Sequence, residues 1–236
     1  MVEWQRDKLR RKLMKKMIVT IIILFIIFIS MVIYRNSQKE AEIKVDEVNK
    51  IENYIEKIYG WKEVTNEALP EFTDINNVDE KWLWAIVREN IEDNEIQYEE
   101  INKKAKEIYG DKFNKEFPKQ GNEFISYNEE TKKYNINQIT LDAVSDVYLL
   151  NKIERDNNGY KVEIIEYLID YTEVENNKVS IKNLKDEKIY ELKEEEATAG
   201  NVKKVVKENI GKFSKKKIYL EKEDERIVVK KIEKEN

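Results

Sequence analysis

Apolar residues follow three different patterns along this chain, and the first has no polar positions to interrupt it. The eighteen residues Met17–Tyr34 are all uncharged and almost all apolar. At about 1.5 Å per residue a helix of this length spans about 27 Å, close to the ~30 Å hydrocarbon core of a bilayer. Because the segment is apolar on every side, it predicts a membrane helix rather than a buried helix of a soluble domain.

A helical period of three and four residues follows this apolar segment. Residues 35–60 carry a seam of apolar residues on a charged background, made of Ala41, Val45, Val48, Ile51, Ile55 and Ile58. The seam predicts a juxtamembrane helix or stalk. It either packs on the domain that follows or pairs with a second copy in a homo-oligomer through Ala41–Ile58. Packing on the domain is favoured, because the seam covers barely two to three heptads.

Two further helices are predicted before the period changes. The first is Val78–Asp93, where Asn77 and Glu80 are spaced as in a capping box. Its apolar residues occupy more than one side, so it should be well buried. Trp82 and Trp84 lie about 200° apart on such a helix, so we expect that they cannot both face the same core. The second helix is Tyr98–Tyr109, followed by Gly110 at the place of a helix C-terminal glycine.

From residue 124 onward a period of two predicts strands. Residues 124–127 and 133–136 form a short hairpin. Residues 144–155 and 160–172 form a long one around Asn158-Gly159, since Asn-Gly is a strong hairpin signal. Two short strands, a helix and a final hairpin follow at 178–181, 188–192, 202–213, 216–221 and 226–232.

This order of elements predicts an α+β fold, in which an N-terminal transmembrane helix and a helical segment precede a mostly antiparallel sheet with one late helix. The expected organisation is a basic cytoplasmic tail (1–16), the transmembrane helix (17–34), the juxtamembrane helix or stalk (35–60) and an extracytoplasmic α+β domain (61–236). No strand–helix–strand unit with a glycine-rich turn is visible, so no nucleotide cofactor is expected.

Charge sets the predicted direction of the membrane helix. Residues 1–16 carry seven cations and two anions, whereas the whole chain has a net charge of −5. Because basic flanks stay in the cytoplasm, the N-terminus is expected inside and the C-terminal domain outside. A cleaved secretion signal is the alternative, but its apolar stretch is shorter and ends in spaced small residues, which are absent after Tyr34.

Composition excludes several classes of function. The chain has no Cys and no His, which removes disulfides, the usual zinc and copper sites, and Ser-His-Asp or Cys-His nucleophiles. The acidic balance after the tail argues against nucleic-acid binding. Lys, Ile, Asn and Glu are abundant, which is typical of a bacterium with an AT-rich genome and a single membrane.

Carboxylates are then the only candidates for acid–base catalysis. Asp146, Glu163, Glu166 and Asp170 lie in predicted strands, where Glu166 and Asp170 could share a face. A solvated strand face is the favoured interpretation. Two oxygen-rich segments, residues 74–80 and 156–159, lack the spacing of a calcium loop, and helix capping and turn chemistry explain them.

Aromatic and basic residues are candidates for contacts with partners. Trp61, Trp82 and Trp84 form a candidate partner surface if a ring is exposed, although core packing is favoured for Trp82 and Trp84. The seven lysines between Lys203 and Lys217 would meet an anionic lipid or polymer, or form the solvated side of a helix and a strand edge; the second interpretation is favoured.

The layout is similar to that of assembly factors of bacterial envelope machines, such as scaffold proteins of conjugation-type secretion systems. This similarity concerns layout alone. It favours a single-pass membrane-anchored, non-enzymatic interaction or assembly factor of the cell envelope. The alternatives are a transmembrane sensor or regulator, and a wall hydrolase that uses two carboxylates.

Overall fold

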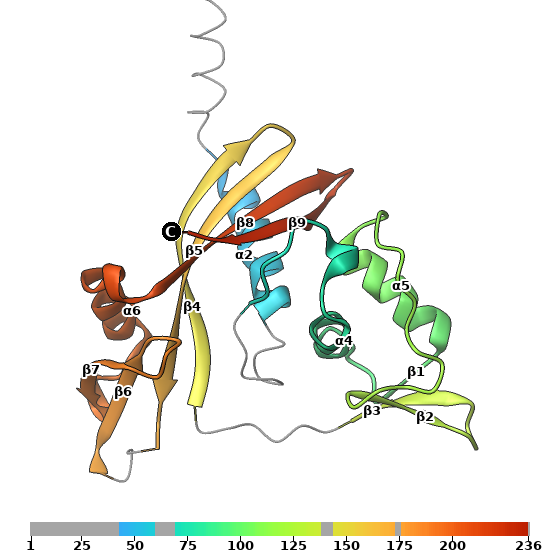
Figure 1. Ribbon diagram of the computed structural model, residues 1–236, viewed down its shortest axis with the longest axis horizontal. Helices are drawn as coiled ribbons and strands as arrows, with labels where there is room; N and C mark the ends of the chain where they lie inside the picture. Colours follow the sequence, from blue (N-terminus) through green and yellow to red (C-terminus); the bar gives the residue numbers. More distant parts are fainter. Residues whose placement is uncertain (1–42, 60–68, 138–143, 173–175, 236) are drawn as a thin grey trace, which may run out of the picture. The chain divides into compact units, whose positions relative to one another are not determined.

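The computed structural model describes residues 43–59, 69–137, 144–172 and 176–235, and residues from Ile43 onward form one compact unit (Figure 1). The predicted α+β class and the mostly antiparallel pairing are confirmed for this part. The basic tail, the Met17–Tyr34 segment and Ala41 lie outside the described residues. Within the described ranges, no helix has the length and apolar character needed to cross a bilayer.

Four α-helices are described, and three of them precede the main sheet. They are α2 (Val45–Tyr59), α4 (Glu80–Glu89), α5 (Tyr98–Tyr109) and α6 (Ala199–Glu208), with 3₁₀ turns at η1 (Ile75–Asn77), η3 (Glu194–Glu196) and η4 (Ile210–Lys212). The bounds of α5 are those predicted. α4 is shorter than predicted at both ends. It begins later because Asp79 and not Asn77 caps it: the Asp79 carboxylate accepts the Lys81 N–H at 2.7 Å. It ends at Glu89, with Asn90 as its C-cap, and not at Asp93.

Nine strands are described, and they form two antiparallel sheets. The small sheet has the order β1-β3-β2, with β1 (Glu95–Ile96), β2 (Ile125–Asn128) and β3 (Lys133–Ile136). The large sheet contains β4 (Val144–Asp156), β5 (Gly159–Asp170), β6 (Lys178–Lys182), β7 (Lys188–Lys193), β8 (Ser214–Glu223) and β9 (Arg226–Lys234). All three predicted hairpins are present, and the two short strands predicted at 178–181 and 188–192 pair with each other as β6 and β7. β1 was not predicted, because a strand of two residues has no readable period.

Strand β5 lies in the middle of the large sheet and pairs with three other strands. β4 pairs with it along its whole length on one edge. On the other edge, residues 159–166 pair with β8 and residues 168–170 pair with β6. β8 and β6 therefore follow one another along the same edge of β5, and each continues into its own hairpin, with β9 and β7 respectively.

The middle of β5 is buried on both faces. Ile164 belongs to the larger core, which contains α2, α4 and α5, while Ile165 belongs to a second core beneath α6. Both side chains are fully buried. Successive residues of a strand point to opposite faces, so the helices on either side of the sheet account for apolar residues at these two consecutive positions. Figure 1 shows α6 beside β6 and β7, away from α4 and α5.

Helix α4 is surrounded by the larger core. Six consecutive residues from Trp82 to Val87 are all buried, as its many-sided apolar pattern predicted. The expectation that Trp82 and Trp84 cannot face the same core is wrong. Trp82 lies near Phe72 and Tyr109 and Trp84 lies near Phe113 and Phe117, all within one cluster, because apolar residues enclose this helix on opposite sides.

Gly159 has a different role from the one its Asn-Gly motif predicted. The hairpin loop is Asn157–Asn158, and Gly159 already pairs with Asp156 as the first residue of β5. A Cβ added at Gly159 would lie 1.8 Å from the Leu220 carbonyl oxygen of β8. Glycine is therefore required here because the two backbones approach closely.

Replacing Gly159 should destabilise the domain by overpacking. We expect Gly159→Ala to lower the free energy of unfolding by about 1–3 kcal/mol, since β5 and β8 must separate. Gly200→Ala is the matched control: a Cβ there meets nothing within 4 Å, and an alanine in helix α6 should stabilise by up to about 1 kcal/mol. Urea unfolding of the full chain, followed by tryptophan fluorescence, measures both. Equal stability of the two variants would contradict the close approach.

Candidate functional site

The candidate catalytic acid Glu166 is wholly buried, so the expectation of a solvated strand face is wrong for this residue. Its Oε2 lies 3.2 Å from Lys216 Nζ of β8. Its Oε1 accepts hydrogen bonds from the Tyr59 hydroxyl and the Leu69 N–H, both at 3.1 Å. Lys216 also donates to the Leu69 carbonyl. This buried ion pair therefore joins β5, β8, the end of α2 and the chain at Leu69.

Asp170 is also buried, and the solvated strand face is again wrong. Its carboxylate lies 2.6 Å from Lys182 Nζ and accepts hydrogen bonds from the Thr172 hydroxyl and N–H. The hydrogen bonds from Lys182 and Thr172 lower the pKa of Asp170 to about 2. A carboxyl group that is ionised at every physiological pH cannot donate a proton, so Asp170 does not fit the role of a general acid.

The remaining oxygen-rich candidates hold the local backbone. Asp74 accepts the Asn76 N–H and caps η1, and Asp79 caps α4, as helix-capping chemistry predicted for this segment. Glu163 accepts a hydrogen bond from Asn151 of the neighbouring strand. The side chain of Asp146 lies outside the described part. Among the described residues, no group of three or more acidic side chains is arranged to hold a metal ion.

The described tryptophans lie in the core. Trp82 is 2% exposed and Trp84 is 1% exposed, so neither ring reaches solvent in this structure. Trp61, the third residue of the candidate partner surface, lies outside the described residues. A partner surface on the described part must therefore be built from other side chains.

A groove lies between α2, α5 and the turn from β8 to β9, with a volume of about 300 Å³. We call it the α2–α5 groove. Its floor contains the buried Tyr54 and Ile108. Its rim is polar, with four cations and two acids, and consists of Lys50, Asn53, Lys57, Asn90, Lys104, Glu107, Glu225 and Arg226, with Ile227 at one side.

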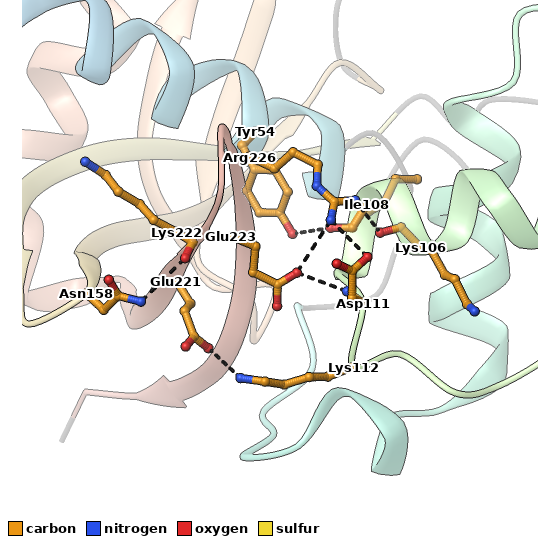
Figure 2. A network of polar contacts seen from close by, with 10 residues as sticks. All are labelled: Tyr54, Lys106, Ile108, Asp111, Lys112, Asn158, Glu221, Lys222, Glu223 and Arg226. Carbon is orange, nitrogen blue, oxygen red and sulfur yellow. Dashed lines mark hydrogen bonds and ion pairs between the residues drawn. The ribbon is translucent and has the colours of Figure 1, made fainter.

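Tyr54 fixes the floor of this groove. Its hydroxyl donates to the Ile108 carbonyl of α5 at 2.8 Å (Figure 2). The same hydroxyl accepts the Val229 N–H of β9 at 2.8 Å. Burial raises its pKa well above the ordinary value, so the hydroxyl stays protonated. A single side chain thus joins the three elements that form the groove.

A chain of ion pairs holds the C-terminal end of α5 against the β8–β9 hairpin. Figure 2 shows Arg226 between Asp111, at 2.9 Å, and Glu223, at 3.8 Å. Glu223 also accepts the Asp111 N–H at 3.0 Å. Gly110 makes this possible: it has a φ of +90°, and a Cβ at this position would lie 2.6 Å from the Glu223 carboxylate.

Some cations of the groove are paired with acids, and others are not. Arg226 is held by the acids just described, and Lys104 lies 3.4 Å from Glu107. The ammonium groups of Lys50 and Lys57 make no ion pair with any described residue, and both side chains are exposed. The groove therefore offers two available cations beside an apolar floor, an arrangement that suits a segment carrying carboxylates and an apolar side chain.

Glu47 secures the first turn of α2 to the large sheet. Its carboxylate accepts hydrogen bonds from Tyr160 at 2.8 Å and Lys222 at 2.9 Å, and it pairs with Arg155. The Lys222 ammonium lies 4.8 Å from the centre of the Tyr160 ring. Hydrogen bonds from Lys222 and then Tyr160 lower the pKa of Glu47 to about 2.

Sequence reasoning missed the groove, because its residues come from three separated segments. Tyr54, Glu107 and Arg226 carry no local signal beyond exposed polarity or helical period. The prediction for Lys216 was wrong for the same reason. This residue belongs to the basic stretch that was expected on a solvated surface, yet it is 4% exposed. Only the pairing of β8 with β5 shows that it lies near Glu166.

Removing one partner of the buried pair should be costly. We expect Lys216→Met to lower the free energy of unfolding by about 3–5 kcal/mol, since the Glu166 carboxylate then stays buried without its cation. The double variant Glu166→Gln with Lys216→Met keeps an acceptor for Tyr59 and removes the charge, so it should be more stable than Lys216→Met alone. Urea unfolding of the four proteins in a double-mutant cycle measures this. Additive losses would contradict the coupling.

Glu47 should make stability fall in acid. Because its pKa is lowered in the folded state, it stabilises the fold above its unfolded pKa of about 4.5. That contribution is lost as the pH falls toward the folded value of about 2. Thermal unfolding of the full chain and of Glu47→Gln should therefore differ most near neutral pH and converge below about pH 3. A constant difference across this range would contradict the assignment.

No known protein family, curated protein or solved structure matches this chain. The function is therefore argued from the residues themselves.

Proposed function

We propose that this chain is a single-pass, membrane-anchored extracytoplasmic protein of a bacterial envelope that acts as a non-enzymatic interaction or assembly factor. The membrane placement is supported by the Met17–Tyr34 segment and its basic flank. The observation that carries the assembly role is the α2–α5 groove. One wall of this groove is α2, the first described helix after the apolar segment in the sequence.

The chemistry of the described side chains supports a binding role over catalysis. The chain contains no Cys or His. The two buried strand acids, Glu166 and Asp170, are each paired with a lysine, and the pKa of Asp170 is lowered to about 2. Proton transfer at neutral pH requires a group whose pKa lies near the operating pH, which Asp170 lacks.

The groove suggests what the partner presents. Lys50 and Lys57 are exposed on the same face of α2, and Tyr54 between them is buried in the floor. We infer that the occupant is a segment of another envelope protein that carries carboxylates toward these lysines and an apolar side chain toward the floor. Charge complementarity of this kind mainly sets specificity and the rate of association.

One cysteine variant tests both placement and assembly, because the chain has no other thiol. Asn53→Cys lies on the exposed rim of the groove. We expect a membrane-impermeant maleimide that carries a photoreactive group to label this variant on intact cells. Illumination should then give a discrete adduct with a second envelope protein. Lys203→Cys on α6 is the control: it should be labelled equally but give no such adduct.

Charge reversal distinguishes a specific partner from a chance neighbour. Lys50→Glu with Lys57→Glu, added to Asn53→Cys, should reduce the yield of the adduct about tenfold, as expected for a loss of about 1.4 kcal/mol. Lys203→Glu with Lys207→Glu makes the same change of charge on α6 and should leave the yield unchanged. Absence of labelling on intact cells would overturn the outward placement. Labelling without an adduct would overturn the role of the groove.

A further inference from the structure

A second pocket, of about 430 Å³, lies beneath the loop between β6 and β7. We call it the β6–β7 pocket. Four lysines line it: Lys185 from the loop, Lys212 from η4, Lys216 from the start of β8 and Lys234 from the end of β9. Phe213 adds an apolar wall. Cations from four separate segments therefore converge on one cavity.

Most of this positive charge is not neutralised within the domain. Lys216 is paired with Glu166 at the base. The ammonium groups of Lys185, Lys212 and Lys234 make no ion pair with any residue that the structure describes, and all three are exposed. Other lysines of the same strands do have partners: Lys182 pairs with Asp170, and Lys217 lies 2.6 Å from Glu235.

Two acids also line the pocket. Glu187 accepts a hydrogen bond from the Asn183 amide at 2.7 Å, which leaves its negative charge in place. Glu71 is exposed at the rim. The three lysines without an ion pair still outnumber these two acids, so the lining keeps an excess of positive charge.

The pocket is built before any ligand binds. Asn183 is only 7% exposed, and its side-chain oxygen accepts the N–H groups of Lys185 and Glu187, both at 3.0 Å. Its amide also reaches the Lys212 carbonyl of η4 at 3.5 Å. One buried side chain thus fixes the loop and η4 relative to each other, so on binding the lysine side chains must become ordered but the backbone of the pocket need not.

We propose that the β6–β7 pocket binds a phosphate group. The cations in its described lining are all lysines, which bind phosphate as point charges from several directions. Lysine is a common phosphate ligand in proteins, and several ammonium groups can approach the different oxygens of one tetrahedral phosphate. The phosphate belongs either to a soluble phosphodiester polymer or to a lipid headgroup. The chemistry of the pocket does not depend on the proposed assembly role, since the α2–α5 groove is lined by other residues.

Protection from acetylation tests this without any substitution. The full chain in neutral detergent micelles is treated with an amine-acetylating reagent, and modification of each lysine is followed by mass spectrometry. Sodium phosphate or poly(glycerol phosphate), at constant ionic strength, should slow the modification of Lys185, Lys212 and Lys234. It should leave Lys203 and Lys207 of α6 unchanged. In a second arm, nanodiscs with and without phosphatidylglycerol test a lipid source.

The affinity of lysine variants is then measured by calorimetry, with whichever probe protects the pocket lysines from acetylation. Lys185→Gln with Lys212→Gln and Lys234→Gln should raise the Kd for that probe about tenfold or more. Lys203→Gln with Lys204→Gln and Lys207→Gln removes the same charge from α6 and should change the Kd less than about twofold. Protection by poly(glycerol phosphate) without any effect of phosphatidylglycerol identifies a soluble source, and protection by phosphatidylglycerol nanodiscs identifies the headgroup. No protection in either arm, or an equal loss in both triple variants, overturns the proposal.

Discussion

The buried ion pair between Glu166 and Lys216 is the constraint on which the arrangement of this domain depends. A carboxylate without exposure to water is tolerated only if its charge is matched and its oxygens accept hydrogen bonds. Glu166 meets both conditions, through Lys216 and through Tyr59 and Leu69. Because these partners come from β8, the end of α2 and the chain before η1, the pair fixes how the helices meet the sheet. The pair is thus a requirement of specificity more than a source of net stability.

Strand β5 explains why such a pair lies inside the domain. Its middle is covered by α2 on one face and α6 on the other, and its two edges are paired with β4 and with β8 and β6. Any polar side chain in this stretch loses water on all sides. Glu166 and Asp170 are therefore each matched by a lysine from the neighbouring strand, β8 or β6. Both acids therefore hold neighbouring strands together, which is consistent with the binding role proposed above.

The two proposed contact regions differ in how many of their cations are paired with acids. Around the α2–α5 groove, Arg226 and Lys104 are engaged by acids, and only Lys50 and Lys57 remain available. Around the β6–β7 pocket, three lysines remain available and converge on one cavity. In a chain with a net charge of −5, both regions are local departures from the overall balance. Such departures are where complementary charges would be recognised.

The sequence by itself determined the elements and their order. The bounds of α5, three of the hairpins and the late helix α6 follow from apolar period, turn residues and helix-terminal glycines, which act over a few residues. The proposed membrane placement also rests on a local run of residues. The tertiary structure alone decided which strands neighbour β5, that Trp82 and Trp84 share one core, that Gly159 is needed for a close approach, and that Lys216 is buried. It also assembled the α2–α5 groove from three segments. These features depend on contacts between residues far apart in the chain, and periodicity holds no information about which distant residue will lie opposite.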